Sequence, residues 1–154
     1  METVSIRRAD QDDADAIGRL IRLTVRQSNG ADYPADVIER VVASFDRQNV
    51  ARFIRQRQVF VAQVGSALVG TASLEGDVVR SVFVQPDVQG AGIGRALMGK
   101  LECVAWDEGL RRLRVPASLT ARGFYESLGY QVMRTISQDN ETTLVMERAL
   151  SRGQ

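Results

Sequence analysis

An α+β fold is predicted for this chain of 154 residues from three features of its sequence. Segments in which apolar and polar residues alternate, as they do in strands, occur in both halves of the chain. Other segments show the 3.6-residue apolar period of helices. Three strand segments in the middle follow one another through tight glycine turns, which is typical of antiparallel pairing. Together these features predict a mixed sheet packed against helices.

The first third of the chain predicts one strand followed by helices. Val4 and Ile6 alternate with polar neighbours in a strand that ends near Arg8, and the carboxylates of residues 10–13 favour a helix start. Pro34 opens a second helix. The expected apolar stripes are Ile17, Leu20, Ile21 and Thr24 in the first helix, Val37, Val41, Val42 and Phe45 in the second, and Val50, Phe53 and Ile54 in a short third turn.

The remainder of the chain predicts six strands and two helices. Gly65-Ser66 joins the first two strands as a hairpin turn, and a turn at residues 75–77 leads into the third. The expected strands cover residues 59–64, 67–74, 78–84, 112–115, about 130–136 and 142–148. The expected helices are one with the stripe Ile93, Leu97, Leu101, Val104 and Ala105, ended by Gly109, and one over residues 119–128 with Ser118 as its N-cap.

Composition and charge bound the range of functions. The 44% hydrophobic and 25% charged residues are ordinary for a globular protein, and no repeat or linker divides the chain, so we expect a single domain over residues 1–154. A net charge of +1 predicts no nucleic-acid or membrane partner. The chain has no histidine and one cysteine, so no metal site is predicted. The first residues lack the apolar core of a signal peptide, and we expect a cytoplasmic protein.

A glycine-rich turn joins the strand at residues 78–84 to the next helix. Gly90, Gly92 and Gly94 leave backbone N–H groups uncovered at the positive end of a helix dipole, where phosphate can bind. A tight turn without any ligand explains the same glycines equally well. Arg95 slightly favours an anion site, since a cation beside a helix N-terminus is unfavourable unless an anion lies there too.

Two nucleotide-binding motifs do not account for this turn. Its G-x-G-x-G spacing differs from the dinucleotide fingerprint, and no acidic residue follows at a strand end about twenty positions later. Residues 94–100 have the spacing of a P-loop, but Leu101 stands where that motif requires Ser or Thr. The turn therefore needs another explanation.

Two blocks of the sequence resemble the GNAT superfamily of acyl-CoA N-acyltransferases. Residues 89–97, QGAGIGRAL, follow the family's Q/R-x-x-G-x-G/A signature behind a strand. Residues 118–130, SLTARGFYESLGY, are similar to its downstream N/S-x-x-A-x-x-F-Y-x-x-L-G-F/Y element. The resemblance is close over residues 59–130 and extends in element order to the whole chain. It implies a GNAT-type fold, in which helices flank both faces of a mixed, mostly antiparallel central sheet.

The resemblance also implies which residues bind acetyl-CoA. In this family the loop amides bind the pyrophosphate, and the backbone of the fourth strand pairs with the pantetheine arm. Many members have Asn at the position of Ser118, and Ser is a common variant there. The resemblance therefore implies that Ser118 contacts the cofactor. The implied cofactor-binding residues are Val82, Phe83 and Val84 in the strand, Gln89, Gly90, Ala91, Gly92, Gly94 and Arg95 in the turn, and Ser118.

Acyl transfer from a thioester to an amine needs a proton for the departing thiolate, a neutral amine and a donor to the developing oxyanion. The resemblance implies that Tyr125 is the proton donor, and a phenol of pKa about 10 is protonated at neutral pH. A backbone N–H near Val84 is the expected oxyanion donor. Glu75 and Asp77, in the turn before the cofactor strand, are the candidate bases; water as the base and a merely solvated turn are the alternatives.

The expected acceptor is a small-molecule or peptide amine. Asp32 and Tyr33, between the first two helices, could hold a cationic amine or form an exposed polar loop. Arg52, Arg55 and Arg57 could meet an acidic acceptor or the nucleotide phosphate, or form a solvated face. The sequence leaves these alternatives open.

Direct attack on acetyl-CoA in a ternary complex is expected, because no catalytic nucleophile stands out. Cys103 falls in the register of the helical stripe and is expected in the core. A non-catalytic acetyl-CoA-binding sensor or interaction module is the alternative function, against which Tyr125 argues. Homodimers are frequent in the family, so a homodimer is compatible with the resemblance.

Overall fold

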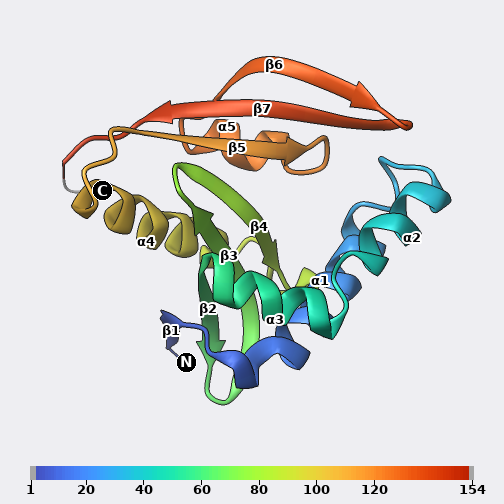
Figure 1. Ribbon diagram of the computed structural model, residues 1–154, viewed down its shortest axis with the longest axis horizontal. Helices are drawn as coiled ribbons and strands as arrows, with labels where there is room; N and C mark the ends of the chain where they lie inside the picture. Colours follow the sequence, from blue (N-terminus) through green and yellow to red (C-terminus); the bar gives the residue numbers. More distant parts are fainter. Residues whose placement is uncertain (1–2, 153–154) are drawn as a thin grey trace.

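A seven-stranded sheet forms the centre of the computed structural model, which describes residues 3–152 (Figure 1). The strand order is β1-β2-β3-β4-β5-β7-β6, and β4 and β5 are the parallel neighbours in an otherwise antiparallel sheet. The strands are β1 (Val4–Arg8), β2 (Gln58–Val64), β3 (Ala67–Glu75), β4 (Val78–Val84), β5 (Arg112–Ser118), β6 (Gln131–Gln138) and β7 (Glu141–Ala149). The predicted α+β class and mostly antiparallel sheet are confirmed.

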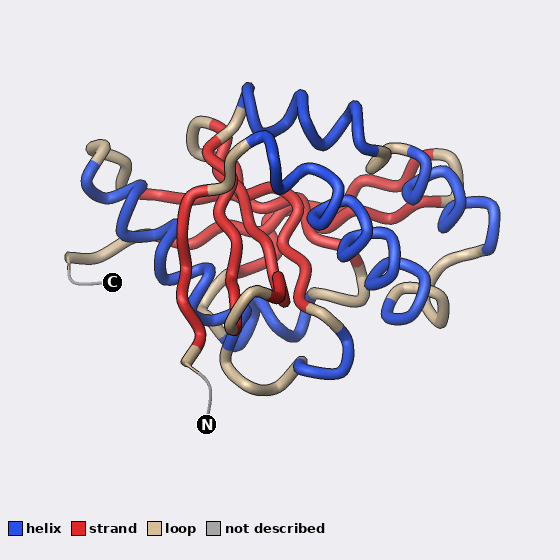
Figure 2. Tube along the Cα trace, turned by 90° about the horizontal axis from the view of Figure 1, so that it is seen from below, coloured by secondary structure: helices blue, strands red, loops and turns tan. Residues whose placement is uncertain are grey.

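Helices cover both faces of this sheet (Figure 2). They are α1 (Ala14–Ser28), α2 (Ala35–Ala43), α3 (Arg47–Gln56), α4 (Ile93–Asp107) and α5 (Arg122–Ser127), with 3-10 turns η1 (Gln11–Asp13) and η2 (Pro86–Val88). Strand β2 shows how alternation divides the core: Val59 and Val61 pack with α1, α2 and α3, whereas Phe60 and Ala62 pack with α4. None of the helices between residues 3 and 152 has the length and apolar character needed to cross a bilayer.

Three local predictions were wrong at the level of element boundaries. Helix α3 has ten residues instead of one turn, because Asp46 caps it by accepting the N–H of Asn49 at 2.8 Å. Ser118 ends β5 instead of capping a helix, since β5 continues past the predicted residues 112–115 to pair with β7. Helix α5 consequently begins only at Arg122, although the Ser118 hydroxyl still accepts the N–H of Ala121 at 3.2 Å.

Cys103 was predicted in the core and is exposed. The buried stripe of α4 includes Leu97, Leu101 and Ala105, with Met98 and Glu102 beside it. Position 103 lies two residues, or about 200°, from Leu101 around the helix, which turns it to the opposite side. The apolar period was read correctly in α4, but Cys103 was assigned to the wrong side of the helix.

The parallel strands β4 and β5 diverge toward their C-terminal ends. Val78 opposite Arg114 is the single residue pair between them in the described part of the sheet. A β-bulge adds to the divergence, because Ser81 and Val82 both lie across from Ala72 of β3. Ser81 has a φ of +53°, a left-handed conformation that is strained for a residue with a side chain. The sheet therefore opens into a gap between β4 and β5.

Candidate active site

Two cavities meet in the gap between β4 and β5. The α2-side cavity, of about 540 Å³, is lined by residues of α2, α3, β4, β5 and β7. The α4-side cavity, of about 300 Å³, is lined by residues of β4, the glycine turn and the starts of α4 and α5. The residues that line both cavities are Asn29, Val82, Phe83, Ser118 and Ala121. Two molecules that enter from different sides could therefore meet in this gap.

The glycine turn exposes its backbone on the α4 side. Gly90 and Gly92 have φ of +88° and +85°, and a Cβ on either would meet no protein atom within 4 Å. Space beside these residues is therefore open, and the first N–H groups of α4 have no partner within the helix. Gly94 differs, because a Cβ there would lie 3.0 Å from the ring of Phe124. Gly94 is explained by the close packing of α4 against that ring.

The other residues of the turn are divided between the cavity and the surface. The Gln89 side chain donates to the Val84 carbonyl at 3.0 Å and to the Ser28 hydroxyl at 3.3 Å, which ties the turn to β4 and α1. Ala91, Gly92 and Arg95 are exposed, and none of the three lines the α4-side cavity. The predicted cofactor residues that do line it are Val82, Phe83, Val84, Gln89, Gly90, Gly94 and Ser118.

Tyr125 lines the α2-side cavity from α5 and is only 4% exposed. Its ring makes edge-to-face contacts with Phe124 and Tyr130, at centroid distances of 5.1 and 5.7 Å. Burial raises the pKa of the Tyr125 hydroxyl above its ordinary value, because the charged phenolate is disfavoured away from water. The hydroxyl is therefore protonated at neutral pH and is able to donate a proton.

The predicted carboxylates lie outside both cavities. Glu75 forms ion pairs with Arg80 and Arg57, at 3.4 and 3.9 Å, and Asp77 pairs with Arg114 at 3.0 Å, at the closed end of the gap. Neither Glu75 nor Asp77 belongs to the residues that line the cavities. Their role as base remains a prediction, and the structure does not place either one beside Tyr125.

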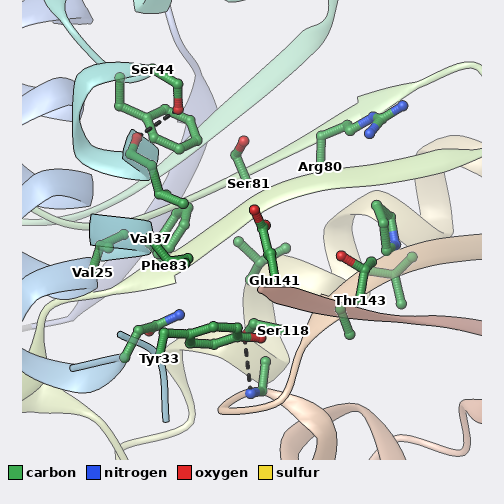
Figure 3. A pocket seen from close by; sticks show the side chains of 18 of the residues that line it. Val25, Tyr33, Val37, Ser44, Arg80, Ser81, Phe83, Ser118, Glu141 and Thr143 are labelled. Carbon is green, nitrogen blue, oxygen red and sulfur yellow. Dashed lines mark hydrogen bonds between the residues drawn. The ribbon is translucent and has the colours of Figure 1, made fainter. Parts of the chain in front are cut away.

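Glu141 is a carboxylate that sequence reasoning missed. It lines the α2-side cavity from β7, as does Thr143, while Ser81 and Phe83 line it from β4 (Figure 3). It forms an ion pair with Arg40 at 3.5 Å. The only local signal was a glutamate at the start of the last strand, and its place in the cavity depends on the pairing of β7 with β5.

The loop between α1 and α2 closes one side of the same cavity. The Tyr33 hydroxyl accepts the N–H of Leu119 at 2.7 Å and donates to the Thr142 carbonyl at 3.0 Å. Asp32 is exposed, accepts the Thr120 hydroxyl at 2.6 Å and does not line the cavity. The loop thus binds the β5 and β7 ends, with the Tyr33 ring on the cavity wall. Between residues 3 and 152, no group of three or more histidine, cysteine or acidic side chains is arranged to hold a metal.

Known proteins share this sequence pattern and this fold. The model of the acetyltransferase (GNAT) domain matches residues 14–148. The chain belongs to the GNAT acetyltransferase family. A GCN5-related N-acetyltransferase from Rhodopseudomonas palustris is 27% identical and superposes with a TM-score of 0.90, covering 97% of this GNAT chain and 98% of that one.

Two further structures share the GNAT fold. The PaiA N-acetyltransferase from Thermoplasma acidophilum, in complex with coenzyme A, has a TM-score of 0.82 at 17% identity, over 96% of this chain and 99% of that one. YncA from Salmonella typhimurium, with its cofactor acetyl-CoA, has a TM-score of 0.73 at 23% identity, over 97% and 95%. The predicted GNAT-type fold is confirmed.

A curated relative is much longer than this GNAT chain. The [citrate [pro-3S]-lyase] ligase from Klebsiella pneumoniae is 24% identical over an alignment of 115 residues, and the match covers 69% of this chain. The match spans only 33% of the ligase, about a third of its length. The likeness is therefore limited to one part of that protein.

Proposed function

We propose that this GNAT chain transfers the acetyl group of acetyl-CoA to the nitrogen of a primary amine, by direct attack in a ternary complex. The main support is the meeting of two cavities at the β4–β5 gap, since donor and acceptor can approach each other there from different sides. Tyr125 on the wall of one cavity supports an enzyme over a module that only binds the cofactor.

The α4-side cavity and the exposed glycine turn beside it fit acetyl-CoA. The uncovered backbone at Gly90 and Gly92 suits phosphate groups at the N-terminus of α4, and the edge of β4 beyond Val78 is free of β5 to pair with amide groups of the pantetheine arm. When bound, acetyl-CoA supplies the acetyl group as a thioester, so that a C–N bond to the acceptor forms while the C–S bond breaks. A backbone N–H of the β4 bulge is the proposed donor to the carbonyl oxygen.

Two side chains of the α2-side cavity are proposed to move protons. Tyr125 gives its hydroxyl proton to the departing sulfur, which leaves as a thiol. Glu141 takes the proton that the acceptor nitrogen loses, directly or through one water. We assign this role to Glu141, in place of Glu75 or Asp77, because Glu141 is the carboxylate on the wall of this cavity. Solvent then returns the two side chains to their starting states.

Glu141→Gln is expected to lower kcat about 100-fold, at the lower end of the range for general acid–base groups. The amide keeps the size of the side chain but accepts no proton from the acceptor. Steady-state rates of thiol release measure the effect, and Glu147→Gln is the matched control, because Glu147 lies on the same strand and pairs with Arg112 outside the cavity. A larger loss of kcat in Glu75→Gln or Asp77→Asn would instead assign the role of base to that residue of the turn between β3 and β4.

The proposed function is tested by thiol release from acetyl-CoA with a panel of small amines, amino acids and peptides. We expect at least one class of amine to accelerate release far above the rate with water alone. Acetyl-CoA binding, measured by calorimetry, is the parallel control. Tight binding without acceleration by any amine would favour the cofactor-binding module.

A further inference from the structure

Two arginines at one end of the α2-side cavity have incomplete hydrogen bonding. Arg57 lies at the end of α3 and Arg80 on β4, and both line the cavity. Their Nε atoms are buried and have no hydrogen-bond partner among the described residues. The Arg57 side chain is only 13% exposed and its guanidinium lies 3.9 Å from the centre of the Phe53 ring, which holds it in place. Buried donors without partners are costly and usually indicate a missing partner.

The charges around this pair are also incompletely matched. The single carboxylate of Glu75 lies between the two guanidinium groups, 3.9 Å from Arg57 Nε and 3.4 Å from Arg80 Nε. Burial lowers the pKa of Arg57, Glu75 raises it, and the neighbouring charges of Arg80 and Arg52 lower it again. Two cations that share one anion leave about one positive charge unmatched. A monoanion in the cavity would balance that charge.

The other charged side chains near the cavity do not offer an equivalent site. Arg40 is already bound to the Asp139 carbonyl at 3.0 Å and to Glu141. Arg52 and Arg55 of the basic cluster are exposed and lie outside the lining, so of that cluster only Arg57 reaches the cavity. The unmatched charge is therefore located at Arg57 and Arg80.

We infer that the acceptor amine also carries a carboxylate, which Arg57 and Arg80 bind at the end of the α2-side cavity. This inference rests on the proposed acetyl transfer and names its substrate class as amino carboxylic acids. Ser81 completes the site, because its hydroxyl lies 3.4 Å from Arg57 Nη1 and it belongs to the bulged part of β4. A carboxylate fits better than a phosphate dianion, since one unmatched positive charge is available. A volume of about 540 Å³ holds a small molecule of this kind.

The test compares ω-amino acids of increasing length, from β-alanine upward, with their carboxamides. Wild-type protein is expected to favour the acids over the carboxamides about 10- to 100-fold in kcat/KM. This is the difference in binding that one or two charge-assisted hydrogen bonds produce. In Arg57→Met and Arg80→Met the ratio of kcat/KM for acid and carboxamide should fall close to one, because KM rises for the acids alone. Methionine retains the apolar stem of Arg57 beside Phe53. If Arg57→Met does not fold, Arg80→Met still tests the inference, because the Arg80 side chain is half-exposed and tolerates replacement. Arg55→Met is the control on the exposed side of α3.

A binding measurement separates this inference from the proposed function. Ligand-observed NMR with γ-hydroxybutyrate and its amide needs no turnover, and only the acid should bind, with loss of binding in Arg57→Met. Amides acetylated as fast as the acids would overturn the carboxylate site while acetyl transfer stands. A preference for aminoethyl phosphate over the amino acids would overturn the carboxylate assignment. No transfer to any amine would overturn the proposed function, and equal NMR binding of acid and amide would overturn the anion site.

Discussion

Replacement of Tyr125 by phenylalanine is expected to lower kcat about 10²- to 10⁴-fold, the usual contribution of a general acid. The ring is buried between Phe124 and Tyr130, so phenylalanine keeps the packing and removes only the hydroxyl. The dissociation constant for acetyl-CoA should remain unchanged, because Tyr125 lines the α2-side cavity and not the α4-side cavity. Thiol-release kinetics at saturating acetyl-CoA measure the effect.

The pH dependence gives this prediction a second, independent readout. Burial raises the pKa of Tyr125, so its proton-donating form persists to higher pH than that of an exposed tyrosine. Loss of kcat through ionisation of Tyr125 is therefore expected only above about pH 10.

Tyr130→Phe is the control, since the Tyr130 hydroxyl binds Glu102 at 2.9 Å, away from both cavities. Retention of most activity in Tyr125→Phe, or equal losses in the two variants, would remove Tyr125 from the mechanism.

Gly92→Val is expected to weaken acetyl-CoA binding at least about 100-fold, equal to the loss of one or two charge-assisted hydrogen bonds to phosphate. A branched side chain disfavours the φ of +85° and projects into the open space beside the turn. Calorimetric titration with acetyl-CoA measures the change, together with the melting temperature of the free protein.

Gly99→Val is the matched control for Gly92→Val. Gly99 lies within α4, the helix that Gly92 precedes, and a Cβ there would likewise meet no protein atom within 4 Å. Near-normal binding is expected in this variant. Full binding by Gly92→Val would mean that the glycines serve only the turn, which was the alternative that the sequence left open.

Local sequence signals were sufficient for most of the fold. Gly65 and Gly76 both adopt positive φ in the turns where hairpin chemistry predicted them, and Gly109 does so after α4. The glycine turn at residues 89–94 was also found, because its signal lies within a few consecutive residues. Such features depend on backbone preferences that neighbouring residues determine.

Features that depend on distant pairing could not be predicted in the same way. The extension of β5 to Ser118 follows from its register with β7, and the bulge at Ser81 follows from pairing with β3. Glu141 enters the cavity by the same long-range pairing, whereas Glu75 and Asp77 were chosen for their nearness in sequence to the cofactor strand. Sequence proximity was therefore a poor guide to which carboxylate lines the cavity.

Transfer of an isotope-labelled acetyl group tests the proposed direct mechanism most directly. The protein is first mixed with labelled acetyl-CoA alone, and an amino acid acceptor is then added while intact protein and small molecules are followed by mass spectrometry. We expect no label on the protein at any time and stoichiometric label in an N-acetyl product, matched by release of free CoA. Label that accumulates on the protein before the acceptor is added, and then passes to the amine, would contradict direct transfer in a ternary complex.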